Sequence, residues 1–323
     1  MPLFTSFSDL VPTPSFFRED IEHADTEARC RAELNESVTS LGRFHRVSIQ
    51  CMEDLASCLH SQGDWLLAEN CYHDCLEATE MIYGYESIEA IRVVGKLAAV
   101  VQIQGKLEEA RMFYNRALDL RTKVQGNEHI STLKTAHNLA LLLEEIGDLA
   151  EAEKFHILAT LGFENILGPL DLNTMKATDN LARLFRIQKM FPEAESLYLR
   201  LLQSKLKVYG QHNVKTLGTL VTLAAVLEDL GKIRVAGEFY KCAIIGYAQI
   251  LGVKHDRTGK VFSVYSDMVV RNSISKEEAE CFYREILSRP LGLDGPPPDD
   301  LSLLLERITA QRQHSVLFNS LYS

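Results

Sequence analysis

Glycine recurs along this chain at a fixed interval of 42 residues, and that period limits the folds that the chain can adopt. The recurring glycines are Gly42, Gly84, Gly126, Gly168, Gly210 and Gly252. A second series keeps the same step and consists of Gly63, Gly105, Gly147 and Gly231, with Lys189 in the remaining place. A repeat of this length is typical of arrays in which each unit packs only on its neighbours.

Apolar positions with the same period indicate what each unit contains. A Leu-Ala pair recurs, and a later alanine is followed four residues on by an aromatic ring. The pairs are Leu55-Ala56, Leu97-Ala98, Leu139-Ala140, Leu181-Ala182 and Leu223-Ala224. The later alanines are Ala68, Ala110, Ala152, Ala194 and Ala236, and their rings are Tyr72, Tyr114, His156, Tyr198 and Tyr240. Alanine lets two helices approach closely, and the residue four positions on shares its helix face.

Each unit is therefore predicted to be a helical hairpin. Glycine ends a helix without the steric penalty of a Cβ atom, so two glycines 21 residues apart mark two helix ends in each unit. One hairpin cannot bury its apolar face alone, so the next hairpin must cover it. The predicted fold class is all-α, a right-handed superhelical solenoid of tandem helical hairpins.

The same period predicts how the chain is divided, with a repeat array flanked by shorter segments. The expected segments are a mobile N-terminal extension over residues 1–20, a capping helix or half repeat over 21–42, six repeats over 43–293, and a Pro-rich linker with a C-terminal capping helix over 294–323. The sixth unit departs from the pattern by one residue, with its alanine at Ala279 and its ring at Tyr283.

These residues resemble the tetratricopeptide repeat, whose first helix carries a Leu-Gly/Ala pair and whose second carries an alanine and then an aromatic. The 42-residue period, with Thr-Leu or Thr-Met pairs opening the first helices at 132, 174 and 216, resembles the kinesin-light-chain-like type. The resemblance implies that the first helices line a concave groove, which in this family binds extended peptides or a partner helix. The chain is therefore expected to be a protein-protein interaction scaffold or adaptor.

The family's groove positions can be transferred onto this chain residue by residue. The resulting peptide-binding groove consists of Arg92, Lys96, Lys134, His137, Asn138, Lys176, Asp179, Asn180, Arg183 and Arg186. In the first unit the same positions are held by Gln50, Glu53, Asp54, Ser57 and His60. An asparagine amide at such a position can both donate to and accept from a peptide backbone.

Six cations of this set form what we call the basic strip: Arg92, Lys96, Lys134, Lys176, Arg183 and Arg186. On a chain with a formal net charge of -10, such clustering favours an acidic protein or peptide as the partner. The alternative is a solvated helix face whose cations form intramolecular pairs with Glu144 and Asp179. Both interpretations stay open at this level.

Catalysis is the competing class of function. His137, Asp179, Glu144 and Glu228 could converge in the groove as acid and base groups. The sequence has no Gly-rich phosphate loop, metal motif or nucleophile elbow, so no catalytic residue and no cofactor are expected. The alternative function is then an unusual enzyme or small-molecule binder that uses the concave pocket, which would need a closed apolar cavity.

Four cysteines of the first unit raise the question of zinc. They are Cys51, Cys58, Cys71 and Cys75, with His60 and His73 nearby. Structural zinc sites bring their ligands in two close pairs, and the first two cysteines are too far apart in sequence to form one. Buried thiols in the small-residue positions of the repeat are the preferred interpretation, and no metal site is expected.

Composition excludes several other classes of protein. The net charge of -10 argues against sequence-independent nucleic-acid binding, which needs an excess of Lys and Arg. The start of the chain lacks the basic and apolar regions of a secretory signal, and no stretch is long and apolar enough to cross a membrane. Seven cysteines within helical patterns indicate free thiols, so a cytoplasmic location is expected.

Overall fold

The computed structural model describes residues 14–272, 281, 282 and 284, and within them the chain forms twelve helices and no strand. The helices are α1 (Pro14–Leu41), α2 (Arg46–Gln62), α3 (Trp65–Tyr83), α4 (Ile88–Ile103), α5 (Leu107–Gln125), α6 (Ile130–Ile146), α7 (Leu149–Leu167), α8 (Leu172–Ile187), α9 (Phe191–Tyr209), α10 (Val214–Asp229), α11 (Ile233–Leu251) and α12 (Asp256–Arg271). The predicted all-α fold of tandem helical hairpins is confirmed.

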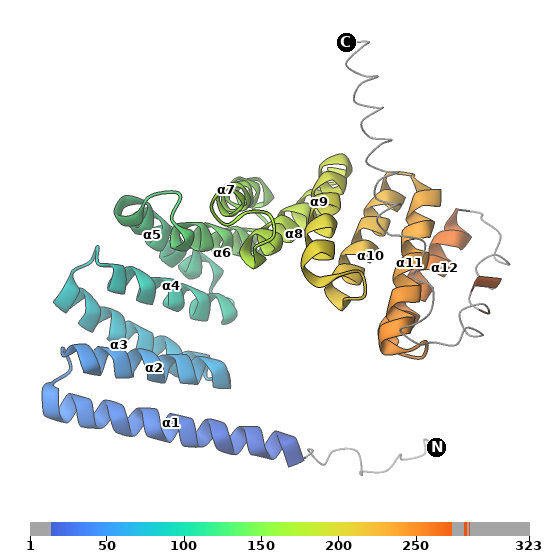
Figure 1. Cartoon of the computed structure of the whole chain (residues 1–323). Helices are drawn as coiled ribbons and strands as arrows, with labels where there is room; N and C mark the ends of the chain where they lie inside the picture. The colour runs from blue at the N-terminus through green and yellow to red at the C-terminus, as the bar shows by residue number, and fades with distance from the viewer. Residues whose placement is uncertain (1–13, 273–280, 283, 285–323) are drawn as a thin grey trace, which may run out of the picture. The chain divides into compact units, whose positions relative to one another are not determined.

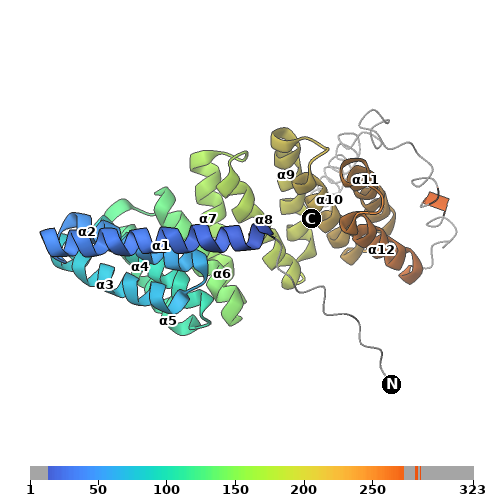
Figure 2. The ribbon, with the colours of Figure 1, turned by 90° about the horizontal axis from the view of Figure 1, so that it is seen from below.

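Five hairpins are complete within the described residues, from α2 with α3 to α10 with α11. The chain divides into two compact units, residues 1–159 and 160–323, and the boundary lies inside α7. In the first unit each helix from α1 to α5 packs on the next helix along the chain, and in the second each helix from α8 to α11 does the same (Figure 1). The longer α1 runs beside α2, as the view from below also shows (Figure 2).

The two glycine series lie where the helices end. Gly63 and Gly147 are left-handed C-caps, with φ of 88° and 95°. Gly84 ends α3 at φ 89° and ψ 160°, a conformation that only glycine adopts without strain. Lys189, which occupies a glycine position, also has a positive φ, of 62°, and no other non-glycine residue among those described does. The repeat therefore imposes this backbone conformation even where the glycine is missing.

Six polar residues with the same 42-residue step begin the first helices, a series that the sequence reading missed. They are His45, Ser87, His129, Asp171, Asn213 and His255. Each side chain accepts a hydrogen bond from a backbone N–H of the first turn, as in Asn173 N to Asp171 Oδ1 at 2.7 Å. A search for capping residues at the repeat period would have found these helix starts from sequence.

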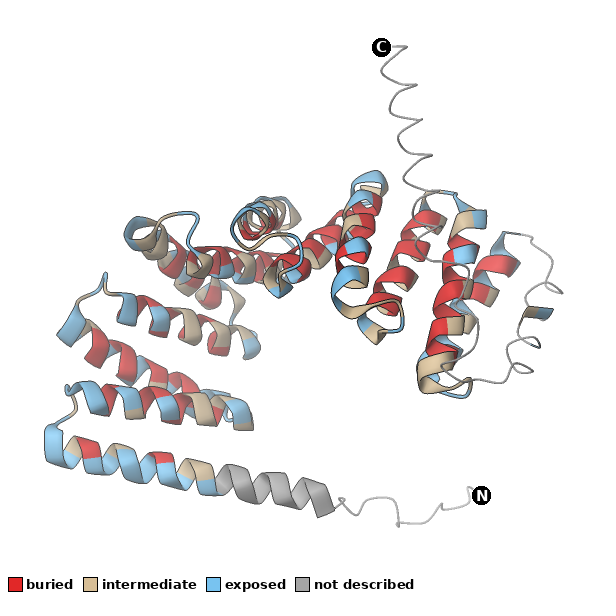
Figure 3. Ribbon diagram, in the orientation of Figure 1, coloured by how far each residue is buried: buried red, intermediate tan, exposed pale blue. Residues whose placement is uncertain are grey.

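The recurring alanines and rings form the core of each hairpin. Figure 3 shows how buried residues recur along the helices. Ala68, Ala110, Ala152, Ala194 and Ala236 are fully buried, and the rings beside them are buried as well. The rings differ in whether their polar atoms have hydrogen-bond partners. The Tyr72 hydroxyl lies 3.0 Å from Ser57 Oγ, whereas the buried Tyr240 hydroxyl has no hydrogen-bond partner among the described residues.

This difference predicts opposite outcomes for one chemical change. Replacing Tyr240 by Phe should leave thermal stability unchanged or raise it slightly, because the lost hydroxyl satisfies no partner. Replacing Tyr72 by Phe should destabilise by about 0.5–1.5 kcal/mol, the net value of one intramolecular hydrogen bond. Thermal denaturation of both variants measures the contrast, and equal losses would contradict it.

Several predictions about the chain ends concern residues outside the described part. Ala279 and Tyr283, expected in the second helix of the sixth unit, lie there, and so do the linker and capping helix expected over 294–323. At the other end, the repeat predicted a helix over residues 21–42, and α1 runs from Pro14 to Leu41.

Candidate functional site

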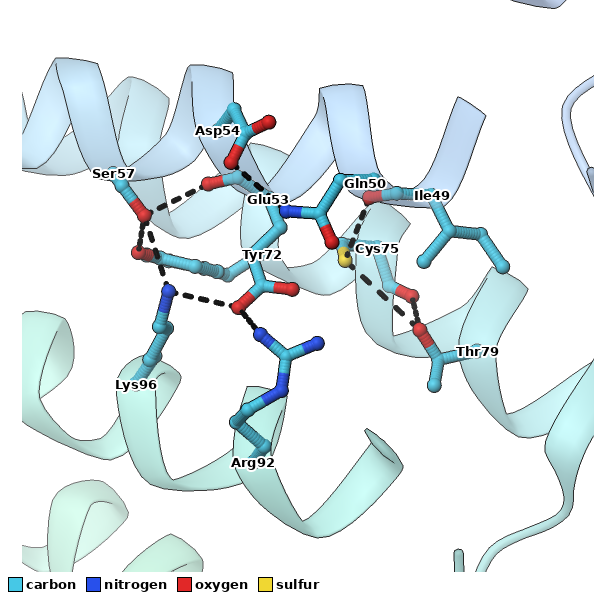
Figure 4. A network of polar contacts seen from close by, with 10 residues as sticks. All are labelled: Ile49, Gln50, Glu53, Asp54, Ser57, Tyr72, Cys75, Thr79, Arg92 and Lys96. Carbon is cyan, nitrogen blue, oxygen red and sulfur yellow. Dashed lines mark hydrogen bonds and ion pairs between the residues drawn. The ribbon is translucent and has the colours of Figure 1, made fainter. Parts of the chain in front are cut away.

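The best-defined polar cluster lies between α2, α3 and α4, and its centre is the carboxylate of Glu53 (Figure 4). Glu53 is only 1% exposed, yet it carries a charge inside the first hairpin. Arg92 and Lys96 of the next first helix, α4, both reach Glu53 Oε1, with the lysine Nζ at 2.8 Å. Lys96 Nζ also lies 3.3 Å from Ser57 Oγ. The cluster therefore ties the first hairpin to the second.

Two cations of the basic strip are thus engaged within the protein. Arg92 and Lys96 still expose 44% and 40% of their side chains, but their charged groups neutralise Glu53. Sequence reasoning placed Glu53 among the groove positions without pairing it to them. The signal was available, because Arg92 and Lys96 follow Glu53 by 39 and 43 residues and so lie about one repeat further on.

The basic-strip residue of α6, Lys134, differs from Arg92 and Lys96 in its contacts. Lys134 is exposed and forms no ion pair with any described residue. Asn138, one turn further along α6, is also exposed. Between them, the His137 ring packs edge-on against His156 of α7, with ring centroids 5.5 Å apart. The fully buried His156 replaces the tyrosine of other units, and its Nε2 lies 2.6 Å from Glu144 Oε1.

In the second unit the predicted residues again divide into two groups. Lys176 of α8 is exposed and has no ion pair among the described residues, and Arg183 is exposed on the same helix. Arg186 instead pairs with Asp229 at 3.3 Å, and Asp179 accepts from Lys205 Nζ at 3.2 Å. The half-buried Asn180 completes the predicted set. The expected pairing partner Asp179 is therefore used, but by a cation of α9 rather than by the strip.

The residues weighed as acid and base groups have structural contacts. In the first unit Glu144 binds His156, and in the second Asp179 binds Lys205 while Glu228 Oε1 lies 3.0 Å from Arg271. A cavity of about 350 Å³ lies between α11 and α12. It is lined by Ile233, Arg234, Gly237, Glu238, Lys241, Tyr265, Met268 and Val269. None of its lining residues belongs to the predicted site.

The four cysteines of the first unit differ in burial. Cys75 is fully buried, and the others are half-buried free thiols. Burial raises the pKa of the Cys75 thiol to about 11, so it stays protonated and is unsuited to bind a metal ion. Among the described residues, the group that brings three possible ligands together is Glu69, His73 and Glu109. Glu69 already binds Lys106, whose Nζ donates hydrogen bonds to both carboxylate oxygens of Glu69 at 2.7 Å.

A second set of ion pairs links successive hairpins and was not foreseen from sequence. Glu69 binds Lys106, and Glu195 binds Lys232 at 2.6 Å, each pair separated by 37 residues. One repeat after Glu69 and Lys106, the charges at these positions are exchanged, with Arg111 4.0 Å from Asp148. Burial raises the pKa of Glu69, but hydrogen bonds from Lys106 and Gln104 outweigh it and hold that pKa below its usual value.

Comparison with known protein families decides what this array is. The family model described as Tetratricopeptide repeat matches residues 47–123, 89–160 and 131–207, three matches whose starts are 42 residues apart. This chain is a tetratricopeptide repeat protein. Its repeats support a general role as a protein-interaction scaffold, and the fold suggests protein partners. Among the described residues, no helix is long and apolar enough to span a bilayer.

Solved structures with the same fold include kinesin-light-chain-like proteins. BtubC (BKLC) from P. vanneervenii is 16% identical, with a TM-score of 0.58, 75% of this chain covered and 91% of that one. Kinesin-light-chain-like TPR repeats from Podosopora anserina are 18% identical, with a TM-score of 0.58 and coverages of 63% and 96%. The apo form of RapI is 12% identical, with a TM-score of 0.57 and coverages of 84% and 93%. A search of curated proteins found no match.

Proposed function

We propose that this tetratricopeptide protein is an adaptor that binds acidic peptide segments of a partner protein through exposed cations of its first helices. The most direct support comes from one position that carries a lysine in two successive repeats. Lys134 on α6 and Lys176 on α8 hold the same repeat position, are both exposed and have no ion pair among the described residues. Such cations can bind a carboxylate without first breaking an internal contact.

The neighbouring amides fit the same role. Asn138 and Asn180 lie four residues after these lysines, one turn along the same helices. An amide that both donates and accepts suits the backbone of an extended peptide, while the lysine supplies the charge for its acidic side chains. Arg92, Lys96 and Arg186 contribute less to this proposal, because each already neutralises a carboxylate of the protein.

The test begins with peptides selected from a displayed random library on the wild-type protein. We expect them to be enriched in Asp and Glu. Replacing Lys134 and Arg183 together by Glu should weaken their binding at least tenfold, since it removes two attractive charges and adds two repulsive ones. The difference should shrink at high salt, where exposed charges are screened. Fluorescence anisotropy measures both effects.

A matched control separates local from global charge. Lys154 of α7 and Lys207 of α9 are exposed lysines on second helices, and replacing both by Glu changes the net charge by the same amount. This control variant should bind the selected peptides nearly as well as wild type. Peptides without acidic enrichment, or equal binding to both double variants, would contradict the proposal.

A further inference from the structure

The repeat itself shows how this protein binds a carboxylate. In the first unit, Glu53 occupies a site formed by Arg92 and Lys96 of the following first helix. A shift of 42 residues carries this arrangement to the next pair of hairpins. There the counterpart of Glu53 is Gly95, that of Arg92 is Lys134 and that of Lys96 is Asn138. The cation and an amide donor are kept at this second position, but the acid is missing.

A second cation faces the position of the missing acid. A Cβ atom built on Gly95 would lie 3.9 Å from Arg121 Nη2, with no other side chain as close. Arg121 is half-buried, its Nε is buried without a hydrogen-bond partner, and no described acidic side chain pairs with it. Burial lowers the pKa of this guanidinium. Buried cations in proteins are normally paired, because desolvation without a counter-charge is costly.

In the second unit, an acidic residue is present at the equivalent repeat position. Two repeats after Gly95 and Arg121 lie Asp179 and Lys205. Lys205 Nζ lies 3.2 Å from Asp179 Oδ2 and 2.7 Å from Thr219 Oγ1. The counterpart of Arg121 is therefore satisfied by an acid at the counterpart of Gly95. Two repeats thus carry an acid at this position, Glu53 bound by two cations and Asp179 by one, and the Gly95 repeat carries cations without the acid.

We propose that the space over Gly95 is a subsite for one carboxylate supplied from outside the chain, held by Arg121 and Lys134 with the Asn138 amide beside them. The subsite deepens the proposed adaptor function and rests on it, since it assigns one acidic group of the bound peptide to one place. The carboxylate can come from an Asp or Glu side chain or from a peptide C-terminus, because both present the same two oxygens.

The decisive experiment returns the acid to the chain. Gly95 is helical without a positive φ, and its ideal Cβ makes only ordinary contact, so the backbone there accepts a side chain. We expect Gly95→Glu to melt about 2–4 °C above the isosteric Gly95→Gln variant, since the new carboxylate pairs with Arg121 and Lys134. The gain should disappear when Arg121→Met is added. Equal melting of the two Gly95 variants would overturn the subsite, whatever peptides the protein binds.

Binding supplies the second readout. Probes are an acetylated, amidated peptide with one Glu, and a neutral peptide prepared as a free acid and as an amide, each competing with the library-selected peptide. We expect Gly95→Glu to weaken the effective competitor at least tenfold relative to Gly95→Gln. The Glu peptide or the free acid, whichever competes, identifies the source of the carboxylate. Competition that is unchanged by Gly95→Glu would overturn the subsite while leaving the adaptor function in place.

Discussion

Replacing Arg92 and Lys96 together by Met should destabilise the first unit by about 3–5 kcal/mol. The reason is the burial of Glu53, whose carboxylate is 1% exposed and whose recorded contacts are with these two cations. Its second oxygen, Oε2, is buried and has no hydrogen-bond partner among the described residues. Without the cations, the protein would hold an uncompensated charge in its interior. Thermal or urea denaturation measures the loss.

Two further variants make this expectation specific. Adding Glu53→Leu to the double variant should restore most of the lost stability, because an apolar side chain needs no counter-charge. Replacing Lys134 by Met, which removes an exposed cation without an ion pair, should change stability by less than about 0.5 kcal/mol. Similar losses for Lys134→Met and the double variant would show that Glu53 is not the cause.

Gly246→Val should destabilise the second unit by about 3 kcal/mol, through overpacking rather than charge. Gly246 lies on α11, where even an ideal Cβ would be 2.6 Å from Leu217 Cδ2 of α10 and 3.0 Å from its Cδ1. Leu217 is 2% exposed and is surrounded by core, so its side chain cannot move aside without cost. The close approach of α10 and α11 thus depends on this glycine.

Gly259 provides the matched control in the same unit. It also lies within a helix, α12, but a Cβ there would meet no heavy atom within 4 Å. Gly259→Val should therefore change stability by less than about 0.5 kcal/mol. Shortening the obstructing side chain, as Leu217→Ala, should cost less in the Gly246→Val background than in wild type. Additive losses in that double-mutant cycle would refute the packing explanation.

The hairpin array could be predicted from sequence because one signal is repeated in every unit. The glycine series, the Leu-Ala pairs and the buried rings are each set by local geometry, so their spacing alone identifies two helices per repeat. The six N-capping residues follow the same period, so they could have been identified from sequence, although they were not predicted. Prediction therefore succeeded where a single residue type recurs, and missed a position at which His, Ser, Asp and Asn replace one another.

The candidate site was harder, because its state depends on which charges meet across hairpins. Sequence placed Arg92, Lys134 and Arg186 in one strip, yet their surroundings differ. Arg92 neutralises Glu53, Arg186 neutralises Asp229, and Lys134 has no ion pair among the described residues. Lys205 and Arg121 come from second helices and were not considered, although they supply charge beside Asp179 and Gly95. Pairing of this kind needs coordinates, or a comparison of residues about one repeat apart.

The exchanged charges of the inter-hairpin ion pairs distinguish the first junction from the second. Glu69 is matched to Lys106, and Arg111 to Asp148, so the first two junctions between hairpins carry ion pairs of opposite polarity. If one 42-residue unit were removed so that the first hairpin met the third, Glu69 would face Asp148, and two carboxylates would repel each other at a junction that now holds a cation and an anion. The hairpins share a fold but cannot replace one another, because removing a unit would place like charges at the new junction.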